Sequence, residues 1–116
     1  MTLASIRASA LRLPGASVIQ QWGDMLVFKV GGKMFLVVAF ADLLPESASF
    51  KAEPDEREEL AETDGMRPAP YLARAGWIQV EDLDGVSASR LNELVRKSHA
   101  LVVAGLSAKK RKELGL

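Results

Sequence analysis

The chain has 116 residues, carries no net charge and contains no cysteine. This length fits one domain, so we expect residues 1–116 to form a single folding unit. The absence of cysteine excludes disulfides, thiolate catalysis and cysteine-based zinc sites, and the balance of 15 basic and 15 acidic residues lacks the basic surplus of a dedicated nucleic-acid-binding protein.

The first elements along the chain are a helix and a short strand. Leu3, Ile6 and Ala10 recur at helical spacing, which predicts a helix over residues 2–12 that the following Leu-Pro-Gly sequence ends. Residues 17–21 are expected to form a strand, and a Trp-Gly-Asp turn follows it.

A β-hairpin is the clearest local signal. The apolar segments 25–30 and 33–40 are joined by Gly31 and Gly32, which supply the two positive φ angles of a type I′ turn. The cross-strand pairs that this two-residue turn predicts are Phe28 with Phe35 and Leu26 with Val37.

The middle of the chain is expected to be more irregular. A loop over residues 42–46 leads to a strand at 47–52. Pro54 then opens an acidic helix that Gly65 ends, and residues 67–70 form a rigid connector rich in proline.

The last third contains a strand and two helices. Residues 71–75 are expected to form one helical turn and residues 77–81 a strand of alternating polarity. Ser87 or Ser89 caps a long helix to about residue 104, and a short final helix follows Ser107. The apolar stripe of the long helix is Leu91, Leu94, Val95, Leu101 and Val102.

The grouping of these elements predicts the fold class. Because the strands run together and the helices stand apart, we expect an α+β two-layer sandwich, with an antiparallel sheet of about five strands and helices packed on one face. The longest apolar run, residues 34–41, is too short for a membrane helix, which needs about 20 residues, and no signal peptide is recognisable at the N-terminus. We therefore expect a cytoplasmic protein.

The charges are distributed unevenly along the chain. Residues 42–64 carry nine acidic and two basic side chains, whereas residues 90–116 carry seven basic and two acidic ones. Such blocks predict separate acidic and basic surfaces on the folded protein.

Several segments, taken in order, resemble the MmcQ/YjbR family. They are residues 13–16, 27–35, 49–51, 67–74 with Trp77, 94–98 and 109–111. The resemblance extends over the whole chain, and the connector followed by Trp77 is its most specific part. It implies a fold similar to the bacterial frataxin (CyaY-like) class and, because the family is commonly described as DNA-binding, a DNA-binding role. His99 stands where the family is expected to carry an aromatic residue.

Basic residues and one aromatic residue are the candidate contacts for nucleic acid or another anion. Lys29 and Lys33 flank the hairpin turn and Lys51 lies on a neighbouring strand, so with Trp77 they could hold phosphates and stack on a base or sugar. The full candidate set is Lys29, Lys33, Lys51, Arg67, Arg74, Trp77, Lys109, Lys110 and Arg111. The alternative is a core tryptophan with lysines at a solvated hairpin tip.

The basic run that starts at Lys109 has two explanations. Lys109 and Lys110 fall in the first turn of a helix, where the helix dipole disfavours cations, and a bound anion would relieve that conflict. The alternative is an ordinary solvated helix face.

The acidic helix suggests a third hypothesis. Asp55, Glu58, Glu59 and Glu62 fall on one helix face, and frataxins use an acidic ridge to meet iron, so the resemblance implies weak cation binding. A tight site needs converging oxygen ligands rather than a row, and the alternative is ordinary helix surface.

No reactive pair of residues is recognisable, so we expect no enzyme, no cofactor and no metal site. The first hypothesis is a DNA-binding module, as a monomer or small homo-oligomer, that contacts DNA through the hairpin tip, Lys51 and the connector. The second is a domain that binds another protein or a small anionic ligand. It predicts scattered lysines and either a concave pocket near Tyr71 and Trp77 or an exposed apolar patch.

Overall fold

One sheet organises the fold, and the computed structural model describes all 116 residues. The strands are β1 (Ala16–Gln21), β2 (Met25–Val30), β3 (Lys33–Ala41), β4 (Leu44–Lys51), β5 (Met66–Pro68) and β6 (Trp77–Val80). The helices are α1 (Leu3–Leu11), α2 (Arg57–Ala61), α3 (Ala88–Ala104) and α4 (Ala108–Glu113), with short 3-10 helices η1 (Ala73–Ala75) and η2 (Leu83–Gly85).

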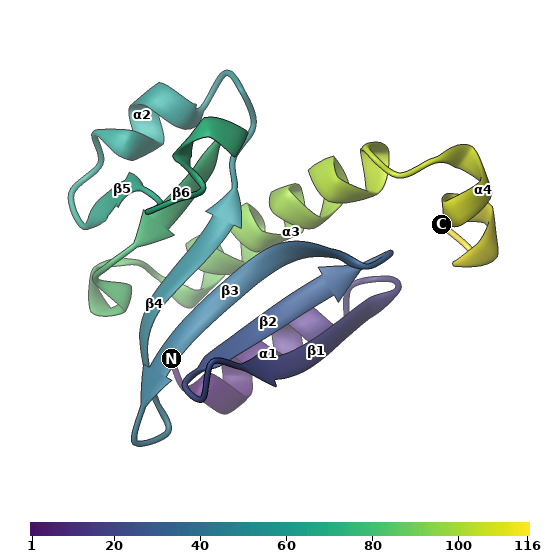
Figure 1. The fold of residues 1–116 in the computed structure, drawn as a ribbon. Helices are drawn as coiled ribbons and strands as arrows, with labels where there is room; N and C mark the ends of the chain where they lie inside the picture. Colours follow the sequence, from purple (N-terminus) through teal and green to yellow (C-terminus); the bar gives the residue numbers. More distant parts are fainter.

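The strands lie in the order β1-β2-β3-β4-β6-β5, and every neighbouring pair is antiparallel (Figure 1). This confirms the predicted α+β class and antiparallel sheet, which has six strands rather than about five. The extra strand is β5, which overlaps the start of the segment predicted as a connector. It forms the edge of the sheet, where Pro68 is tolerated because a proline there removes few ladder hydrogen bonds.

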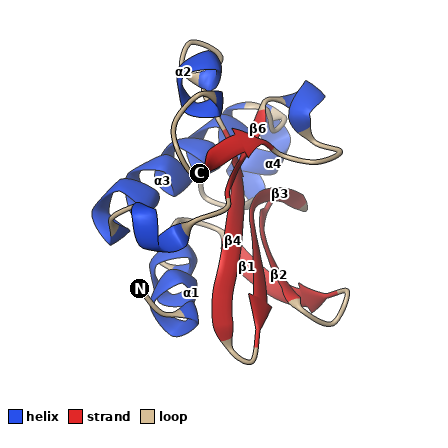
Figure 2. Ribbon diagram, turned by 90° about the vertical axis from the view of Figure 1, so that its left-hand side faces the viewer, coloured by secondary structure: helices blue, strands red, loops and turns tan.

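Helices α1 and α3 cover one face of the sheet, and Figure 2 shows both on the same side of the strands. The apolar stripe of α3, including Leu91, Leu94 and Val102, is buried against this face. Side chains from both layers form one hydrophobic cluster of 19 buried residues. None of the helices combines the length and the apolar character that a membrane crossing requires.

A capping box starts α1. The Thr2 hydroxyl accepts a hydrogen bond from the Ser5 N–H, and the Ser5 hydroxyl accepts one from the Thr2 N–H, each at 3.0 Å. These bonds satisfy N–H groups that no helical carbonyl can reach. The helix predicted over residues 2–12 is confirmed to within one residue at each end.

The β2–β3 hairpin has the predicted turn but not the predicted register. Gly31 and Gly32 have φ angles of 60° and 81°, as a type I′ turn requires. Beyond the turn a β-bulge places Phe28 opposite Leu36, and Leu26 opposite Val38, so the predicted pairs are wrong by one residue. The bulge inserts Phe35 as an extra residue, which lets Phe35 and Leu36 both be fully buried.

The predicted loop over residues 42–46 is also wrong. Asp42 and Leu43 alone form the turn, both with positive φ angles (50° and 63°), and β4 begins at Leu44. Pro45 pairs with Phe40 at a register shift, in a part of β4 where β6 does not pair. A proline is acceptable there because β4 has a neighbouring strand on one side only.

The acidic helix is shorter than predicted. It runs over Arg57–Ala61, and residues 54–56 form a turn before it. The guanidinium of Arg57 donates a hydrogen bond to the Ala52 carbonyl (Nε to O, 3.0 Å) and lies where a side chain on Gly76 would stand. Gly76 also has a φ angle of 81°, so a glycine is required there for both reasons.

Ser98 of α3 joins β3 to β4 where the bulge separates them. Its hydroxyl accepts a hydrogen bond from the Lys51 N–H (2.9 Å) and donates one to the Phe35 carbonyl (2.7 Å). The side chain is fully buried. Leu36–Phe50 is the last residue pair at this end of the β3–β4 ladder. Beyond it, the Ser98 hydroxyl links the two strands in place of a direct backbone hydrogen bond.

Replacing Phe35 by alanine is expected to lower the free energy of unfolding by about 3–5 kcal/mol, because it empties a fully buried site. Urea denaturation measures the change. Ile19→Ala, at an exposed position of the edge strand β1, is the control and should change stability by less than about 0.5 kcal/mol. Equal losses at the two positions would show that Phe35 is not part of the core.

Replacing Ser98 by alanine is expected to cost about 1–3 kcal/mol, since it leaves the Lys51 N–H and the Phe35 carbonyl without a partner. Ser89→Ala, at an exposed position of the same helix, should be nearly neutral. Slower amide exchange at Lys51 in the Ser98→Ala variant would contradict the bridging role, because it would mean that the ladder closes directly.

Candidate functional site

The β2–β3 turn brings two of the predicted lysines to one end of the sheet. Lys33 and Lys51 line a cleft of about 140 Å³ together with Trp77, and the C-terminal part of α3 forms its other wall. Lys29 of β2 pairs with Met34 of β3. Both side chains lie on the face of the sheet that the helices leave uncovered.

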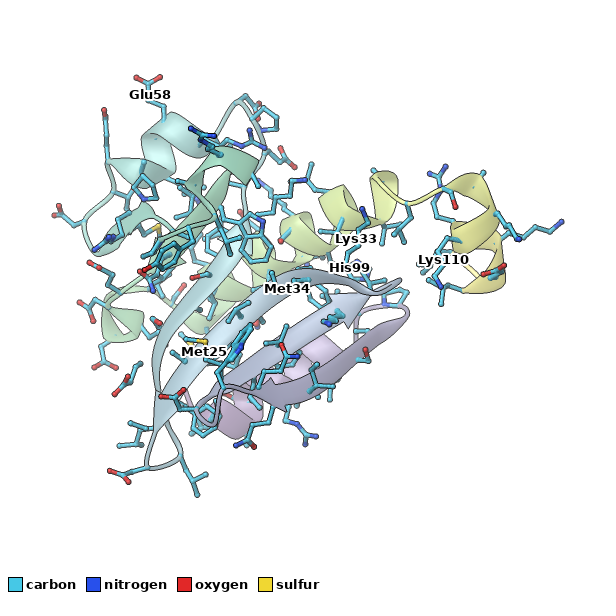
Figure 3. The ribbon with its side chains drawn as sticks, in the orientation of Figure 1. Met25, Lys33, Met34, Glu58, His99 and Lys110 are labelled. Carbon is cyan, nitrogen blue, oxygen red and sulfur yellow. The ribbon has the colours of Figure 1, made fainter.

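Helix α4 extends the same end of the molecule. The segment that leads into it contacts the turn, since a side chain on Gly31 would lie only 2.7 Å from a methyl group of Leu106. The Ser107 hydroxyl caps α4 by accepting a hydrogen bond from the Lys110 N–H at 3.1 Å. Lys109 and Lys110 are exposed there, and Figure 3 shows Lys110 beyond the end of the sheet.

Arg111 of α4 is placed differently from the two lysines. It is partly buried and lies in a groove with Leu13, Pro14 and Leu116. This groove is on the helix layer, so the basic run is divided between two surfaces.

The two arginines of the candidate set lie near β6 and differ in their partners. Arg67 forms an ion pair with Glu81 (Nη1 to Oε1, 3.1 Å) on the β5–β6 edge. Arg74 lies in η1 and does not line the cleft that holds Lys33 and Lys51. Of the basic residues expected at the connector, Arg67 is therefore neutralised by a carboxylate, whereas Arg74 forms no ion pair.

Trp77 cannot act as the exposed stacking platform considered from the sequence. It is 5% exposed, because it pairs with Lys51 on β4 and lies beside Leu101 and Val102 of α3. The alternative explanation, a packed tryptophan, describes its position.

The antiparallel connections separate the charges in space. The turns β1–β2 and β3–β4 lie at the end of the sheet opposite to the β2–β3 turn (Figure 1). Asp24 and Asp42 lie at these two turns, and Lys29 and Lys33 flank the other. The turns of the sheet therefore carry aspartates at one end and lysines at the other.

The carboxylates of the acidic helix do not converge on one point. No three acidic or histidine side chains lie close enough together to hold a metal ion. The cation-binding hypothesis requires carboxylates that converge, and these carboxylates do not. Glu56 instead accepts a hydrogen bond from Lys97 of α3 (Nζ to Oε1, 2.7 Å). This bond is the main cause that raises the pKa of Lys97 above its ordinary value of 10.5.

His99 is part of the packing between layers. Its Nε2 lies 2.8 Å from the Pro14 carbonyl oxygen, and its ring meets that of Phe35 edge to face at 5.2 Å. The side chain is buried and no acidic or nucleophilic side chain is hydrogen-bonded to it, so it ties α3 to the segment before β1.

A larger cleft, which we call the open-face cleft, lies on the side of the sheet away from α1 and α3. Its volume is about 530 Å³, and no charged side chain lines it. The floor includes Met25, Met34 and Val37, and Figure 3 shows both methionines on this face. Trp22 and Tyr71 also line it. The sequence predicted a pocket near Tyr71 and Trp77, and the cleft lies at Tyr71 but does not include Trp77.

One sequence signal could have located this cleft. Strands β2 and β3 are apolar at consecutive positions rather than at alternate ones, as in Met25 to Phe28. Such a strand has apolar side chains on both faces, and α1 and α3 cover only one of them.

The comparison with known families decides the identity. The model of the YjbR family matches residues 11–101 of the chain. This chain belongs to the YjbR family. The resemblance found in the sequence is thereby confirmed, and no curated protein matches the chain.

Two solved structures are similar to this YjbR domain. The crystal structure of Deinococcus radiodurans protein DR2400, with a DUF419 domain, is 32% identical, covers 99% of this chain and 88% of its own, and superposes with a TM-score of 0.84. A protein from Pseudomonas syringae is 18% identical, covers 84% of this chain and 96% of its own, and gives a TM-score of 0.66. The second shares the fold alone.

The Lys97–Glu56 pair predicts a specific pH dependence. Because the pKa of Lys97 is raised in the folded state, its stabilising effect is present below the unfolded value of 10.5 and is lost as the pH rises through the folded value. Wild type and Glu56→Gln should therefore differ in stability by a constant amount between about pH 6 and about pH 9, and the difference should shrink above that range. A difference that persists unchanged at strongly alkaline pH would contradict this ion pair.

Proposed function

We propose that this YjbR domain is a non-enzymatic cytoplasmic binding module that engages duplex DNA through its basic end. The basic end is defined here as Lys29, Lys33, Lys51, Lys109 and Lys110. The observation that carries the proposal is that these five lysines lie at one end of the sheet and none of them is in an ion pair, whereas Arg67, Arg90 and Lys97 are paired with carboxylates.

Unpaired lysine ammonium groups suit phosphates better than bases. They act as point charges that neutralise the DNA backbone and carry no sequence information. Because the whole chain has no net charge, the attraction comes from this end alone. We therefore expect modest affinity, strong salt dependence and little sequence preference.

The contact surface is smaller than the one that the sequence suggested. Arg67 is neutralised by Glu81 and Trp77 is packed. The hairpin turn and α4 remain, and the contact between Leu106 and the turn holds them together.

A small anionic ligand is the second candidate, favoured by the cleft between Lys33 and Lys51. Its volume of about 140 Å³ admits a small anion but no nucleobase stacked on Trp77. Inorganic phosphate that competes at millimolar concentration would support this ligand over DNA.

The test of the DNA proposal is a titration of fluorescent duplex DNA at about 50 and about 200 mM salt. About four phosphate contacts would lower the affinity about 100-fold over this range. Lys33→Glu should lower the affinity about 10-fold and reduce the salt slope by about one.

Arg7→Glu is the matched control, since it makes the same change of net charge at an exposed residue beside the opposite turns of the sheet. It should change the affinity by less than about 2-fold, because the Debye length is about 10 Å at this salt. No binding at the lower salt, or equal effects of the two substitutions, would refute the proposal.

A further inference from the structure

The open-face cleft has a composition that differs from the basic end. Its floor contains two methionines and Val37, and none of its lining side chains is charged. A charged ligand would lose its hydration there without gaining a partner. The cleft therefore selects for uncharged, mostly apolar molecules, and DNA does not fit it.

Two aromatic side chains at the cleft are held in unfavourable positions. Trp22 is 68% exposed and Tyr71 is fully exposed, although large apolar rings are stabilised by burial. Their φ angles are 54° and 66°, in the left-handed region that residues with a Cβ adopt at a cost. Neither packing nor backbone preference explains these residues, whereas a ligand held against their rings would.

Two polar side chains of the cleft have hydrogen-bonding groups that the protein leaves unused. Ser49 and Gln79 face each other across β4 and β6, and both line the cleft. The only side-chain hydrogen bond of this pair is a long one, from Gln79 Nε2 to Ser47 Oγ at 3.5 Å. The Ser49 hydroxyl and the Gln79 carbonyl oxygen are thus free to bind one polar group of a ligand.

We infer that the open-face cleft binds a small, uncharged, planar molecule that carries one hydrogen-bonding group. Its apolar body lies on Met25, Met34 and Val37, its ring contacts Trp22 and Tyr71, and its polar group meets Ser49 and Gln79. The thioethers suit this ligand because methionine adapts its shape and makes favourable contacts with aromatic rings.

The size of the cleft favours a small molecule over a protein partner. A volume of about 530 Å³ lies within the range of small-ligand sites, about 300–1,000 Å³. Charged groups border it, because Arg67, which is paired with Glu81, lies opposite the cleft residue Gln79 on the next strand, so the uncharged surface is confined to the cleft.

The test uses two dyes that share a ring system and differ in charge. N-phenyl-naphthylamine is uncharged, consists of two flat ring systems and carries one N–H, whereas anilinonaphthalene sulfonate adds a negative charge. Dye emission is followed while the full chain is titrated. We expect the uncharged dye to bind at least about 10-fold more tightly than the sulfonate, a ratio that corresponds to about 1.4 kcal/mol.

Variants at two exposed positions and at the buried Ser49 test the site. Tyr71→Gly removes the ring and suits the left-handed backbone, and it should weaken the uncharged dye at least about 10-fold. Leu43→Gly is the matched control, because Leu43 is also exposed (76%) and has a φ angle of 63° but lies outside the cleft. It should leave the affinity unchanged. Ser49→Ala should weaken the dye by a few-fold through loss of the hydrogen bond.

Several outcomes would overturn the inference. Tighter binding of the sulfonate would show that the cleft does not select for neutral ligands, and equal effects of Tyr71→Gly and Leu43→Gly would place the dye elsewhere. Sedimentation that shows a dimer abolished by Tyr71→Gly, with no dye bound to the monomer, would assign this face to contact between two copies. None of these outcomes depends on whether DNA binds the basic end.

Discussion

The β-bulge at Phe35 is the local feature on which the packing of the two layers depends. By adding one residue to β3, it lets Phe35 and Leu36 both enter the core, although neighbouring strand residues normally face opposite sides. The bulge also parts β3 from β4, and the Ser98 hydroxyl of α3 enters the gap and satisfies both backbones. His99, the next residue, packs on the Phe35 ring and contacts the Pro14 carbonyl. The bulge thus fixes where α3 lies on the sheet.

The antiparallel order of the first four strands has a consequence for function. Successive turns alternate between the two ends of the sheet, so the glycine turn with its lysines lies at one end and the turns with Asp24 and Asp42 lie at the other. A chain with no net charge thereby acquires a basic end, which α4 extends. The open-face cleft is apolar and lies on the uncovered face of the sheet. The basic end and the cleft therefore suit ligands of different chemistry, and one domain can offer both.

Short-range signals in the sequence predicted most of the elements. The Gly31–Gly32 turn, α1 and the serine cap of α3 depend on residues within a few positions of one another, so periodicity and capping chemistry were sufficient. The turn at Asp42 and Leu43 was missed because neither residue is a glycine, and strand pairing holds the left-handed backbone there. Strand β5 was missed because an edge strand of three residues, one of them proline, carries no alternating pattern. The register of β2 and β3 was wrong because core packing, and not the turn, selected the bulge.

The sequence by itself determined the family, the α+β class, the absence of cysteine chemistry and the separation of charge into blocks. The candidate lysines were also recognisable, because lysine is exposed in almost any fold. Only the tertiary structure decided that Lys33 and Lys51 share a cleft while Arg67 pairs with Glu81, and that Trp77 is packed. It also decided which apolar face of the sheet the helices cover. These outcomes depend on contacts between residues far apart in the chain, and such contacts leave no local pattern in the sequence.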